Sequence, residues 1–232
     1  MSVARGFFIA GTDTGVGKTA VAAGLIRVFR ERGLDVGVMK PVSTGGSNDA
    51  RVLRHAAGVQ DPMQDINPVS FAAPLSPNVA ARLEKKDVDL EGVLEAFSRL
   101  CSKHSWMIVE GVGGLLVPIR EDFVVANLAD WIGLPLIVVS RASLGTINHT
   151  LLTLEAAASR DLQVCGIVYC VPQAGPLDAA AQTSPEVVTR LSGIPSLGTI
   201  PFDSEVDVEK GFLGEMHTSV ERHIDLERLM AD

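Results

Sequence analysis

The stretch GFFIAGTDTGVGKT, residues 6–19, decides the fold. An apolar run with the length of a β-strand leads directly into a glycine-rich loop, and a helix-forming segment begins at Lys18. Such a loop binds phosphate, because its backbone N–H groups and the N-terminus of the helix face one anion. Lys18 would add a positive charge there, and the hydroxyl of Thr19 could bind Mg²⁺. The stretch therefore predicts a nucleoside triphosphate site.

The loop is one residue longer than the usual phosphate-binding loop, G-x-x-x-x-G-K-[ST]. Five residues separate Gly11 from Gly17, and Thr12 stands where the first glycine is expected. The additional residue removes no N–H donor, and Gly15 and Gly17 allow the backbone to approach a phosphate closely. The alternative is a glycine-rich turn that only joins a strand to a helix. The sequence GKT at the junction makes that alternative the weaker one.

Short apolar runs alternate with helical segments along the chain, which predicts an α/β fold. Most runs are apolar at consecutive positions, as in a mostly parallel sheet that is covered by helices on both faces. We predict a single domain, residues 1–232, of the P-loop NTPase-like (Rossmann-like) class. The expected strands are Gly6–Ala10, Val36–Met39, Met107–Val109, Leu136–Val139, Val164–Tyr169 and Leu197–Ile200. The expected helices are Lys18–Arg32, Asp49–Ala57, Leu90–Lys103, Ala126–Ile132, Thr146–Arg160 and Pro185–Leu191.

Two further segments are predicted by composition and pattern. Residues 171–185 are rich in Pro, Ala and Ser and are expected to form a mobile loop. The sequence ERHIDLERLM, residues 221–230, is expected to form a closing amphipathic helix. The tail from Asp203 onward could cover either the base of a nucleotide or the edge of a dimer.

Composition and charge exclude several classes of protein. The 20 basic and 28 acidic residues give a formal net charge of −8, and no run of Lys or Arg could follow a nucleic acid backbone. No apolar stretch is long enough to span a membrane, and the N-terminus lacks a secretory signal. We therefore expect a cytoplasmic protein with no nucleic acid or membrane partner. Three cysteines without C-x-x-C spacing predict buried free thiols, not disulfides or a zinc site.

Charged residues stand near the expected carboxyl ends of strands, where ligands of parallel sheets bind. Glu110 follows an apolar run and precedes a glycine-rich turn, and Asp49 begins an expected helix. Both carboxylates could bind Mg²⁺. Lys40 ends a strand and could stabilise charge on a transferred phosphoryl group. The alternatives are a surface charge for Glu110, a helix cap for Asp49 and a solvent-directed side chain for Lys40.

Taken together, GTDTGVGKT, KPVSTGG, SNDA, VEGVGG and LGTINHTLLT resemble the dethiobiotin synthetase family, which is ATP-dependent and acts in biotin biosynthesis. The motifs follow the family's order and spacing from Gly11 to about Thr153. A weaker likeness in GIVYC and LGTIPF continues to about Phe202. The longer phosphate-binding loop is the family's own form.

The resemblance implies a reaction that the residues alone do not reveal. In this family, CO2 adds to 7,8-diaminopelargonic acid to form a carbamate, which ATP phosphorylates to a carbamic-phosphoric anhydride. The second amine then closes the ureido ring of dethiobiotin and releases phosphate. Such chemistry needs positioning and charge neutralisation, and it needs no covalent nucleophile on the protein.

The resemblance also implies roles for individual residues. Lys18 and Lys40 would be catalytic, and Thr19, Asp49 and Glu110 would bind Mg²⁺. The nucleotide would be bound by Gly11, Thr12, Asp13, Thr14, Gly15, Val16, Gly17, Lys18, Thr19, Glu110, Gly113, Cys170 and Pro201. The diamine or its carbamate would be bound by Lys40, Thr44, Gly113, Leu144, Gly145 and Asn148. In the family, the helix that begins within SLGTINHT meets the carboxylate of a substrate held by the other subunit, which implies a homodimer.

Two positions depart from the family pattern. Gly15 stands where many members have a glutamate that lies near the substrate and phosphates. Cys170 stands where the family commonly has an asparagine that recognises adenine, and a thiol cannot replace the paired donor and acceptor of an amide. The preference for ATP over other nucleoside triphosphates therefore stays open.

Other P-loop proteins offer competing readings. A nucleotide-driven dimer switch, of the kind that positions cell components or carries metal clusters, would share the fold. Such switches usually have an additional lysine at the start of the loop, where this chain has Gly11 and Thr12. Corrinoid amidation enzymes need a glutamine amidotransferase domain, for which 232 residues leave no room. A member that binds nucleotide without turnover is disfavoured by the presence of both lysines and both carboxylates.

Overall fold

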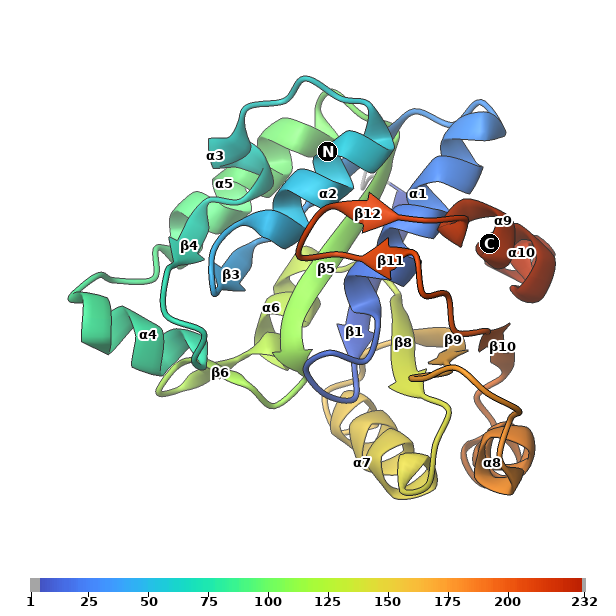
Figure 1. The fold of residues 1–232 in the computed structure, drawn as a ribbon. Helices are drawn as coiled ribbons and strands as arrows, with labels where there is room; N and C mark the ends of the chain where they lie inside the picture. Colours follow the sequence, from blue (N-terminus) through green and yellow to red (C-terminus); the bar gives the residue numbers. More distant parts are fainter. Residues whose placement is uncertain (1–4, 231–232) are drawn as a thin grey trace.

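A six-stranded parallel sheet forms the centre of the computed structural model, which describes residues 5–230 (Figure 1). The strand order is β10-β9-β8-β1-β5-β2, so β1 lies between β5 and β8. The strands span Arg5–Gly11 (β1), Val36–Met39 (β2), Trp106–Gly114 (β5), Leu136–Arg141 (β8), Val164–Cys170 (β9) and Ser196–Ile200 (β10). All six predicted strands are confirmed. The glycine-rich loop after β1 therefore leaves from the middle of the sheet.

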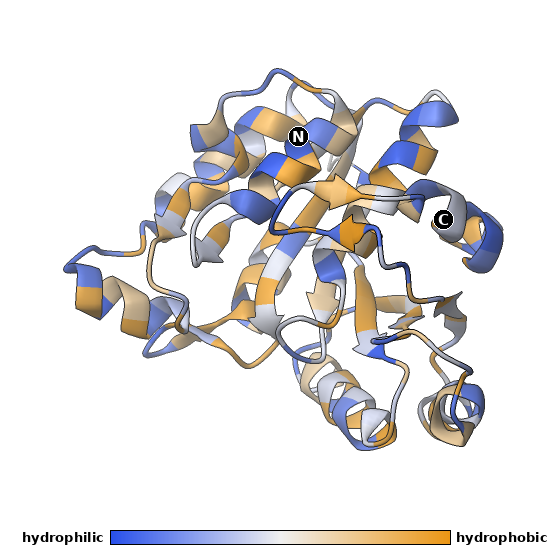
Figure 2. Ribbon diagram, viewed as in Figure 1, coloured by the Kyte–Doolittle hydropathy of each residue, from blue (hydrophilic) through white to orange (hydrophobic). Residues whose placement is uncertain are grey.

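Helices cover both faces of this sheet, as the sequence predicts. Phe7 and Ile9 of β1 belong to one core, and Phe8 and Ala10 belong to the core on the opposite face. In Figure 2 the helices carry both orange apolar and blue polar residues, as expected where one side of each helix packs on the sheet. The first core is covered by α1 (Lys18–Glu31), α2 (Asn48–Ala57), α9 (Met216–His223) and α10 (Leu226–Met230). The opposite face is covered by α4 (Pro77–Glu84), α5 (Leu90–Cys101), α6 (Val125–Ile132), α7 (Thr146–Ala158) and α8 (Ala179–Ser192).

Local signals in the sequence explain several helix boundaries. α5 begins after Asp89, whose carboxylate accepts a hydrogen bond of 2.9 Å from the backbone N–H of Gly92. Gly193 ends α8 in the left-handed conformation, with φ 75°, as its position predicts. Within residues 5–230, no helix combines the length and apolar character needed to cross a membrane.

The prediction of a loop over residues 171–185 and of a helix from Pro185 is wrong in part. α8 begins six residues earlier, at Ala179, because the carboxylate of Asp178 caps it by accepting a 2.7 Å hydrogen bond from the N–H of Ala181. Pro185, which we interpreted as a first-turn residue, lies inside the helix. The capping aspartate was a stronger start signal than the proline.

The predicted closing helix over residues 221–230 is divided into α9 and α10. Ile224 is buried between them, and the N–H of Asp225 donates to the carbonyl of Leu197 in β10. α9 packs so closely on α1 that a Cβ atom at Gly24 would lie 2.6 Å from Val220. Figure 1 shows the red C-terminal segment, with β11 (Val206–Asp207) and β12 (Phe212–Leu213), beside α1 and α2.

Several short elements were not predicted. β3 (Val42–Thr44) pairs with β4 (Val69–Phe71) in parallel, and β6 (Pro118–Arg120) pairs with β7 (Phe123–Val124) in antiparallel fashion. The four-residue helix α3 spans Met63–Ile66. Segments of two to four residues are too short to show a hydrophobic period, so sequence alone does not reveal them.

A histidine joins three loops at the amino edge of the sheet. Nδ1 of His104 lies 2.9 Å from Oδ1 of Asp35, and Nε2 lies 2.9 Å from Oδ2 of Asp61. Burial lowers the pKa of His104, but hydrogen bonds to the two carboxylates outweigh that effect and raise it above its ordinary value. An imidazolium donates through both nitrogens, so the protonated form fits both contacts. Gly37 leaves room for the ring, since a Cβ there would lie 2.5 Å from it.

Replacing His104 with Asn should therefore destabilise the protein in a pH-dependent way. Because the pKa of His104 is raised in the folded state, its contribution to the free energy of unfolding is complete below about pH 6.5, the pKa of an unfolded histidine. The contribution is lost as the pH rises through the pKa of His104 in the folded protein. We expect a loss of about 1.5–3 kcal/mol at pH 6 and a smaller loss at pH 9, measured by urea unfolding. His223→Asn, at an exposed position, serves as the control. An equal loss at both pH values for His104→Asn would contradict the charged contact.

Candidate active site

A cleft of about 1010 Å³ opens at the carboxyl edge of the sheet and contains most of the predicted site residues. It brings together the loop after β1, the ends of β2 and β5, the start of α2 and the turn before α4. Ten of the predicted residues line it: Thr14, Gly15, Gly17, Lys18, Thr19, Lys40, Thr44, Asp49, Glu110 and Gly113. Charged side chains and the glycine-rich loop, which are far apart in sequence, thus share one cavity.

The glycine-rich loop has the backbone that its sequence predicts. Gly15 and Gly17 have φ values of 69° and 103°, in the region that favours glycine, and α1 begins directly after Gly17. Nζ of Lys18 donates to the carbonyl of Asp13 at 2.8 Å, so this side chain folds back along the loop. A Cβ atom at Gly11 would lie 2.7 Å from that Nζ atom. Gly11 therefore leaves room for the side chain of Lys18. It lies one residue further from Gly17 than the first glycine of the usual loop does.

The register of the sheet places Lys40 beside Glu110. Met39 of β2 lies opposite Val109 of β5, so the residues that follow them, Lys40 and Glu110, lie side by side. Nζ of Lys40 is 2.5 Å from Oε1 of Glu110 and 2.8 Å from Oδ2 of Asp49. The hydroxyl of Thr19 donates to the same Oε1 atom at 2.8 Å. One buried cluster thus joins the loop, β2, β5 and α2.

This cluster overturns the three structural alternatives for its members. Lys40 and Glu110 are 2% and 0% exposed, so neither a solvent-directed lysine nor a surface carboxylate is present. Asp49 lies in the first turn of α2, where Ser47 is the N-cap residue. Its carboxylate faces Lys40 and does not cap the helix.

Burial and neighbouring charges set the protonation of the cluster. Burial lowers the pKa of Lys18 to about 8, and the charge of Lys40 adds to that effect. Burial also acts to lower the pKa of Lys40, but the carboxylates of Glu110 and Asp49 outweigh it and raise the value. Burial raises the pKa of Glu110, and the Lys40 ammonium opposes that shift. We assign the proton of this contact pair to Lys40, because its ammonium touches two carboxylates.

The donor set suits a hard divalent cation. Oε2 of Glu110 is buried and has no hydrogen-bond partner among the residues that the structure describes. Thr19 and Asp49 place a hydroxyl and a second carboxylate in the same cluster. Within residues 5–230, no group of three or more His, Cys, Asp and Glu side chains is arranged to hold a metal ion. Two carboxylates with a hydroxyl resemble the partial protein ligation that Mg²⁺ takes beside phosphates.

Other predicted residues lie outside the cleft. Cys170, at the end of β9, touches the loop, since a Cβ at Gly17 would lie 2.9 Å from its sulfur. Burial raises the pKa of this thiol to about 12, so the thiol stays protonated. Pro201 lines a separate pocket of about 650 Å³ with Phe202, Asp203 and other residues of the tail. This pocket lies at the ends of β9 and β10 and is separate from the cleft at the glycine-rich loop.

The residues predicted to bind the substrate carboxylate are not brought to this cleft. Gly145 caps α7 with φ 94° and without a side-chain hydrogen bond, so the first N–H groups of the helix have no side-chain cap. Leu144 beside it is 90% exposed, and Asn148 is also exposed. Within one chain, the start of α7 and the cleft are separate features.

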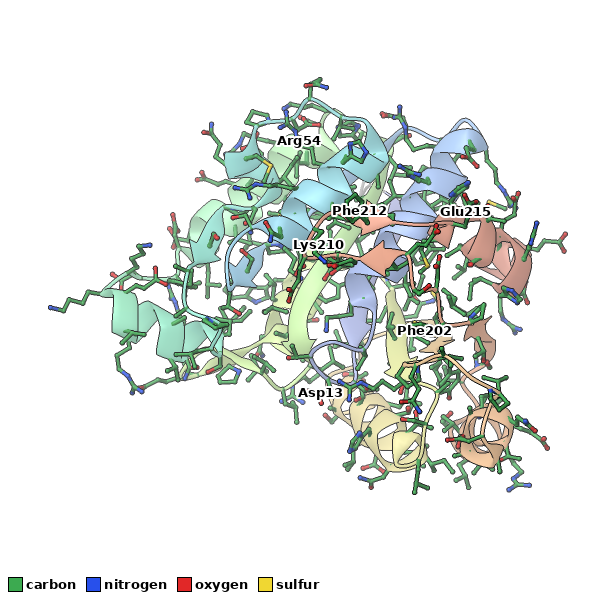
Figure 3. All side chains as sticks on the ribbon, in the orientation of Figure 1. Asp13, Arg54, Phe202, Lys210, Phe212 and Glu215 are labelled. Atoms are coloured by element: carbon green, nitrogen blue, oxygen red, sulfur yellow. The ribbon has the colours of Figure 1, made fainter. Side chains whose placement is uncertain are left out.

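Sequence reasoning missed several residues that line the cleft. Pro74, Leu75, Ser76 and Pro77 enter it from the turn before α4, and the Ser-Pro pair was a usable signal for the start of that helix. Val208, Glu209 and Lys210 enter it from the C-terminal tail. Figure 3 labels Lys210 on this tail and Asp13 on the loop after β1. The carbonyl of Glu209 accepts a hydrogen bond from Asn48, beside Asp49, and no local pattern predicts that contact.

Comparison with known proteins shows the family to which the chain belongs. A protein from Thermodesulfovibrio yellowstonii named ATP-dependent dethiobiotin synthetase is 40% identical over 97% of this chain and 98% of its own length. Proteins with the same name from Bacillus subtilis subsp. natto and Anaeromyxobacter dehalogenans are 42% and 43% identical, over 97% and 91% of this chain and 97% and 96% of their own lengths. The chain belongs to the dethiobiotin synthetase family. Residues 5–210 also match the family described as AAA domain.

Solved structures support the fold prediction. A ParA family ATPase from Chlorobium tepidum superposes with a TM-score of 0.57 over 100% of both chains, at 14% identity. The septum site-determining protein MinD from Pyrococcus horikoshii superposes with a TM-score of 0.55 over 94% of this chain and 88% of its own, at 20% identity. At these identities the likeness concerns the fold alone. The dethiobiotin synthetase fold is thus of the P-loop NTPase type, as predicted.

Nucleotide binding should take up a proton at alkaline pH. Lys18, with a pKa of about 8, is mostly uncharged at pH 9, and the negative charge of a bound triphosphate raises that pKa. We expect proton uptake near zero at pH 6.5 and approaching one proton at pH 9. Calorimetric titration with the Mg²⁺ complex of AMP-PNP, in buffers of different ionisation enthalpy, measures this uptake. Lys85→Met is the surface control, and equal uptake at both pH values would contradict the role of Lys18.

Proposed function

We propose that this protein catalyses the ATP-dependent carboxylation and ring closure of 7,8-diaminopelargonic acid, which forms dethiobiotin. The observation that carries the proposal is the single cleft in which Lys18, Lys40 and two carboxylates meet a phosphate-binding loop. Relatives with this activity in their name match almost the whole chain. The reaction places it among ATP-dependent ligases that form carbon–nitrogen bonds.

The reaction consumes CO2, the diamine and ATP. One amine of the diamine adds to CO2 and loses a proton, giving a carbamate. A carbamate oxygen attacks the γ-phosphorus, and ADP leaves with the electrons of the broken P–O bond. The second amine attacks the carbonyl carbon of the resulting carbamic-phosphoric anhydride, loses a proton, and expels phosphate. Every step is a polar bond exchange, so the protein has to align reactants and stabilise negative charge.

Lys18 and Lys40 are suited to stabilise that charge from two sides. Lys18 lies along the loop that holds the phosphates, and Lys40 lies at the end of β2, next to Thr44 of the short strand β3. In this proposal, Lys18 contacts the β- and γ-phosphates and Lys40 contacts the transferred phosphoryl group and the carbamate. Thr44 and Gly113 border the diamine. The buried position of both ammonium groups makes their electrostatic effect larger than in water.

We assign Mg²⁺ binding to Thr19, Asp49 and Glu110. The unpartnered buried Oε2 atom of Glu110 supports this assignment. An ion bound there would supply positive charge that neutralises the phosphates. Lys40, which contacts Asp49 and Glu110, would lie beside it and add its own positive charge at the same place.

The nucleotide is assigned to the loop, with its base toward β9 and β10. The nine residues from Gly11 to Thr19, together with Gly113, would bind the phosphates and the ribose of the nucleotide. The pocket that contains Pro201 and Phe202 supports placement of the base there, next to Cys170. Because the protonated thiol offers little hydrogen bonding, backbone groups around Pro201 would read the base. ATP remains the proposed nucleotide.

A homodimer would complete the substrate site. Leu144, Gly145 and Asn148 lie at the start of α7, apart from the cleft of their own chain, and the uncapped N–H groups suit a carboxylate. In the dimer, this helix start would meet the distal carboxylate of a diamine held by the partner subunit. We propose that residues 1–232 act as one domain in the cytoplasm, without a nucleic acid or membrane partner.

Formation of dethiobiotin tests the function directly. The purified protein, mixed with diaminopelargonate, bicarbonate and MgATP, should yield dethiobiotin by mass spectrometry. Lys18→Ala and Lys40→Met should each lower kcat by roughly 10²–10³-fold, because each removes charge that stabilises the phosphoryl transfer. Circular dichroism checks that the variants fold. Absence of product from the wild-type protein refutes the function, and full activity in either folded variant refutes the assigned lysine.

Magnesium dependence tests the metal assignment. Glu110→Gln keeps the shape of the side chain but removes one negative charge, so the Mg²⁺ concentration for half-maximal rate should rise by about tenfold or more. Initial rates at fixed ATP and varied Mg²⁺ measure this change. Glu91→Gln, an exposed position on α5, should titrate like the wild type. If Glu110→Gln also titrates like the wild type, Glu110 is not a ligand.

A further inference from the structure

The carboxyl end of β8 holds the glycine-rich loop at three consecutive residues. The carbonyl of Val139 accepts a 3.0 Å hydrogen bond from the N–H of Thr12. Nη2 of Arg141 donates to the carbonyl of Thr14 at 2.9 Å. Between them, the hydroxyl of Ser140 lies 3.4 Å from that of Thr12. The position of the loop is thus tied to the end of a strand that lines no wall of the cleft.

The same serine holds the first turns of α7. Oγ of Ser140 lies 2.8 Å from Oγ1 of Thr146 and 2.9 Å from Oγ1 of Thr150, and the two threonine oxygens are 3.4 Å apart. Ser140 is 1% exposed and Thr150 is 0% exposed. We call Ser140, Thr146 and Thr150 the hydroxyl cluster. It is a buried polar contact between β8 and α7, on a face where apolar residues make the surrounding contacts.

Hydrogen bonds make this contact directional. Apolar side chains of similar shape would fill the same space and would tolerate small rotations of α7 against the sheet. The three hydroxyls lose their partners if the helix turns or slides, and a buried hydroxyl without a partner is unfavourable. The hydroxyl cluster therefore fixes the orientation of α7 to the strand end that also fixes the loop.

We propose that the hydroxyl cluster couples the nucleotide loop to α7, so that nucleotide and diamine strengthen each other's binding. This inference rests on the proposed function, which places at the start of α7 the carboxylate of a diamine held by the other subunit of the dimer, so the coupling acts between the nucleotide of one subunit and the diamine of the other. Thr150 is a positioning residue here, because it is fully buried and acts only through the helix. A nucleotide that orders the loop would reduce the conformational entropy that is lost when the diamine binds at α7. By thermodynamic linkage, the diamine then strengthens nucleotide binding by the same factor as the nucleotide strengthens diamine binding.

A matched pair of threonines on α7 allows a direct test. Thr150→Val removes a hydroxyl of the cluster and keeps the side-chain shape. Thr153→Val does the same at a buried neighbour, whose hydroxyl donates only to the carbonyl of His149 in its own helix, at 2.8 Å. Calorimetry of diaminopelargonate binding, with and without the Mg²⁺ complex of AMP-PNP, gives the coupling factor for each protein. Thr150→Ser, which retains the hydroxyl, tests rescue.

We expect nucleotide to tighten diamine binding by roughly fivefold or more in the wild type, within the usual range of coupling between sites. Thr150→Val should bring this factor close to one, whereas Thr153→Val and Thr150→Ser should keep it. A factor in Thr150→Val equal to that of the wild type overturns the inference, and so does a wild-type factor of one. Failure of the proposed function is a separate result, because the wild type would then form no dethiobiotin.

Discussion

In-register pairing of three parallel strands brings the charges of this site together. Met39 lies opposite Val109, and Ile9 lies opposite Glu110, so Lys40, Glu110 and the loop after β1 lie toward the same edge of the sheet. A shift of one residue would turn a side chain to the opposite face, where the second apolar core lies. The apolar residues that fix the register therefore also fix the distance of 2.5 Å between Lys40 and Glu110. The same strand register is therefore needed both to pack the core and to build the site.

The environment gives the two lysines different properties. Lys40 touches two carboxylates and has a raised pKa, whereas Lys18 is buried without such a contact and has a pKa of about 8. A bound triphosphate supplies the negative charge that Lys18 lacks. In the proposed function, Lys40 contacts the reacting groups as well as its two carboxylates. The same side-chain type would thus serve once as a phosphate contact and once as a group that is shared between the protein and the reactants.

Sequence reasoning was most successful where elements are long and local signals are strong. GTDTGVGKT, the apolar runs and the charges at Lys40 and Glu110 predicted the fold and the core of the cleft. It failed where structure depends on distant contacts or very short segments. The tail residues Val208–Lys210 line the cleft although they lie far along the chain from its other residues, and α8 begins at Ala179 because the carboxylate of Asp178 caps it. The two carboxylates that flank His104 are distant in sequence, so no pattern could reveal that contact.

The contacts of Lys40 have a consequence for how the protein is made. Two buried or half-buried carboxylates next to one another would repel during folding, but this chain supplies its own countercharge from β2. The countercharge to Glu110 and Asp49 is thus part of the polypeptide itself. Under the proposed Mg²⁺ assignment, a shortage of magnesium would slow turnover while leaving the pool of folded protein intact.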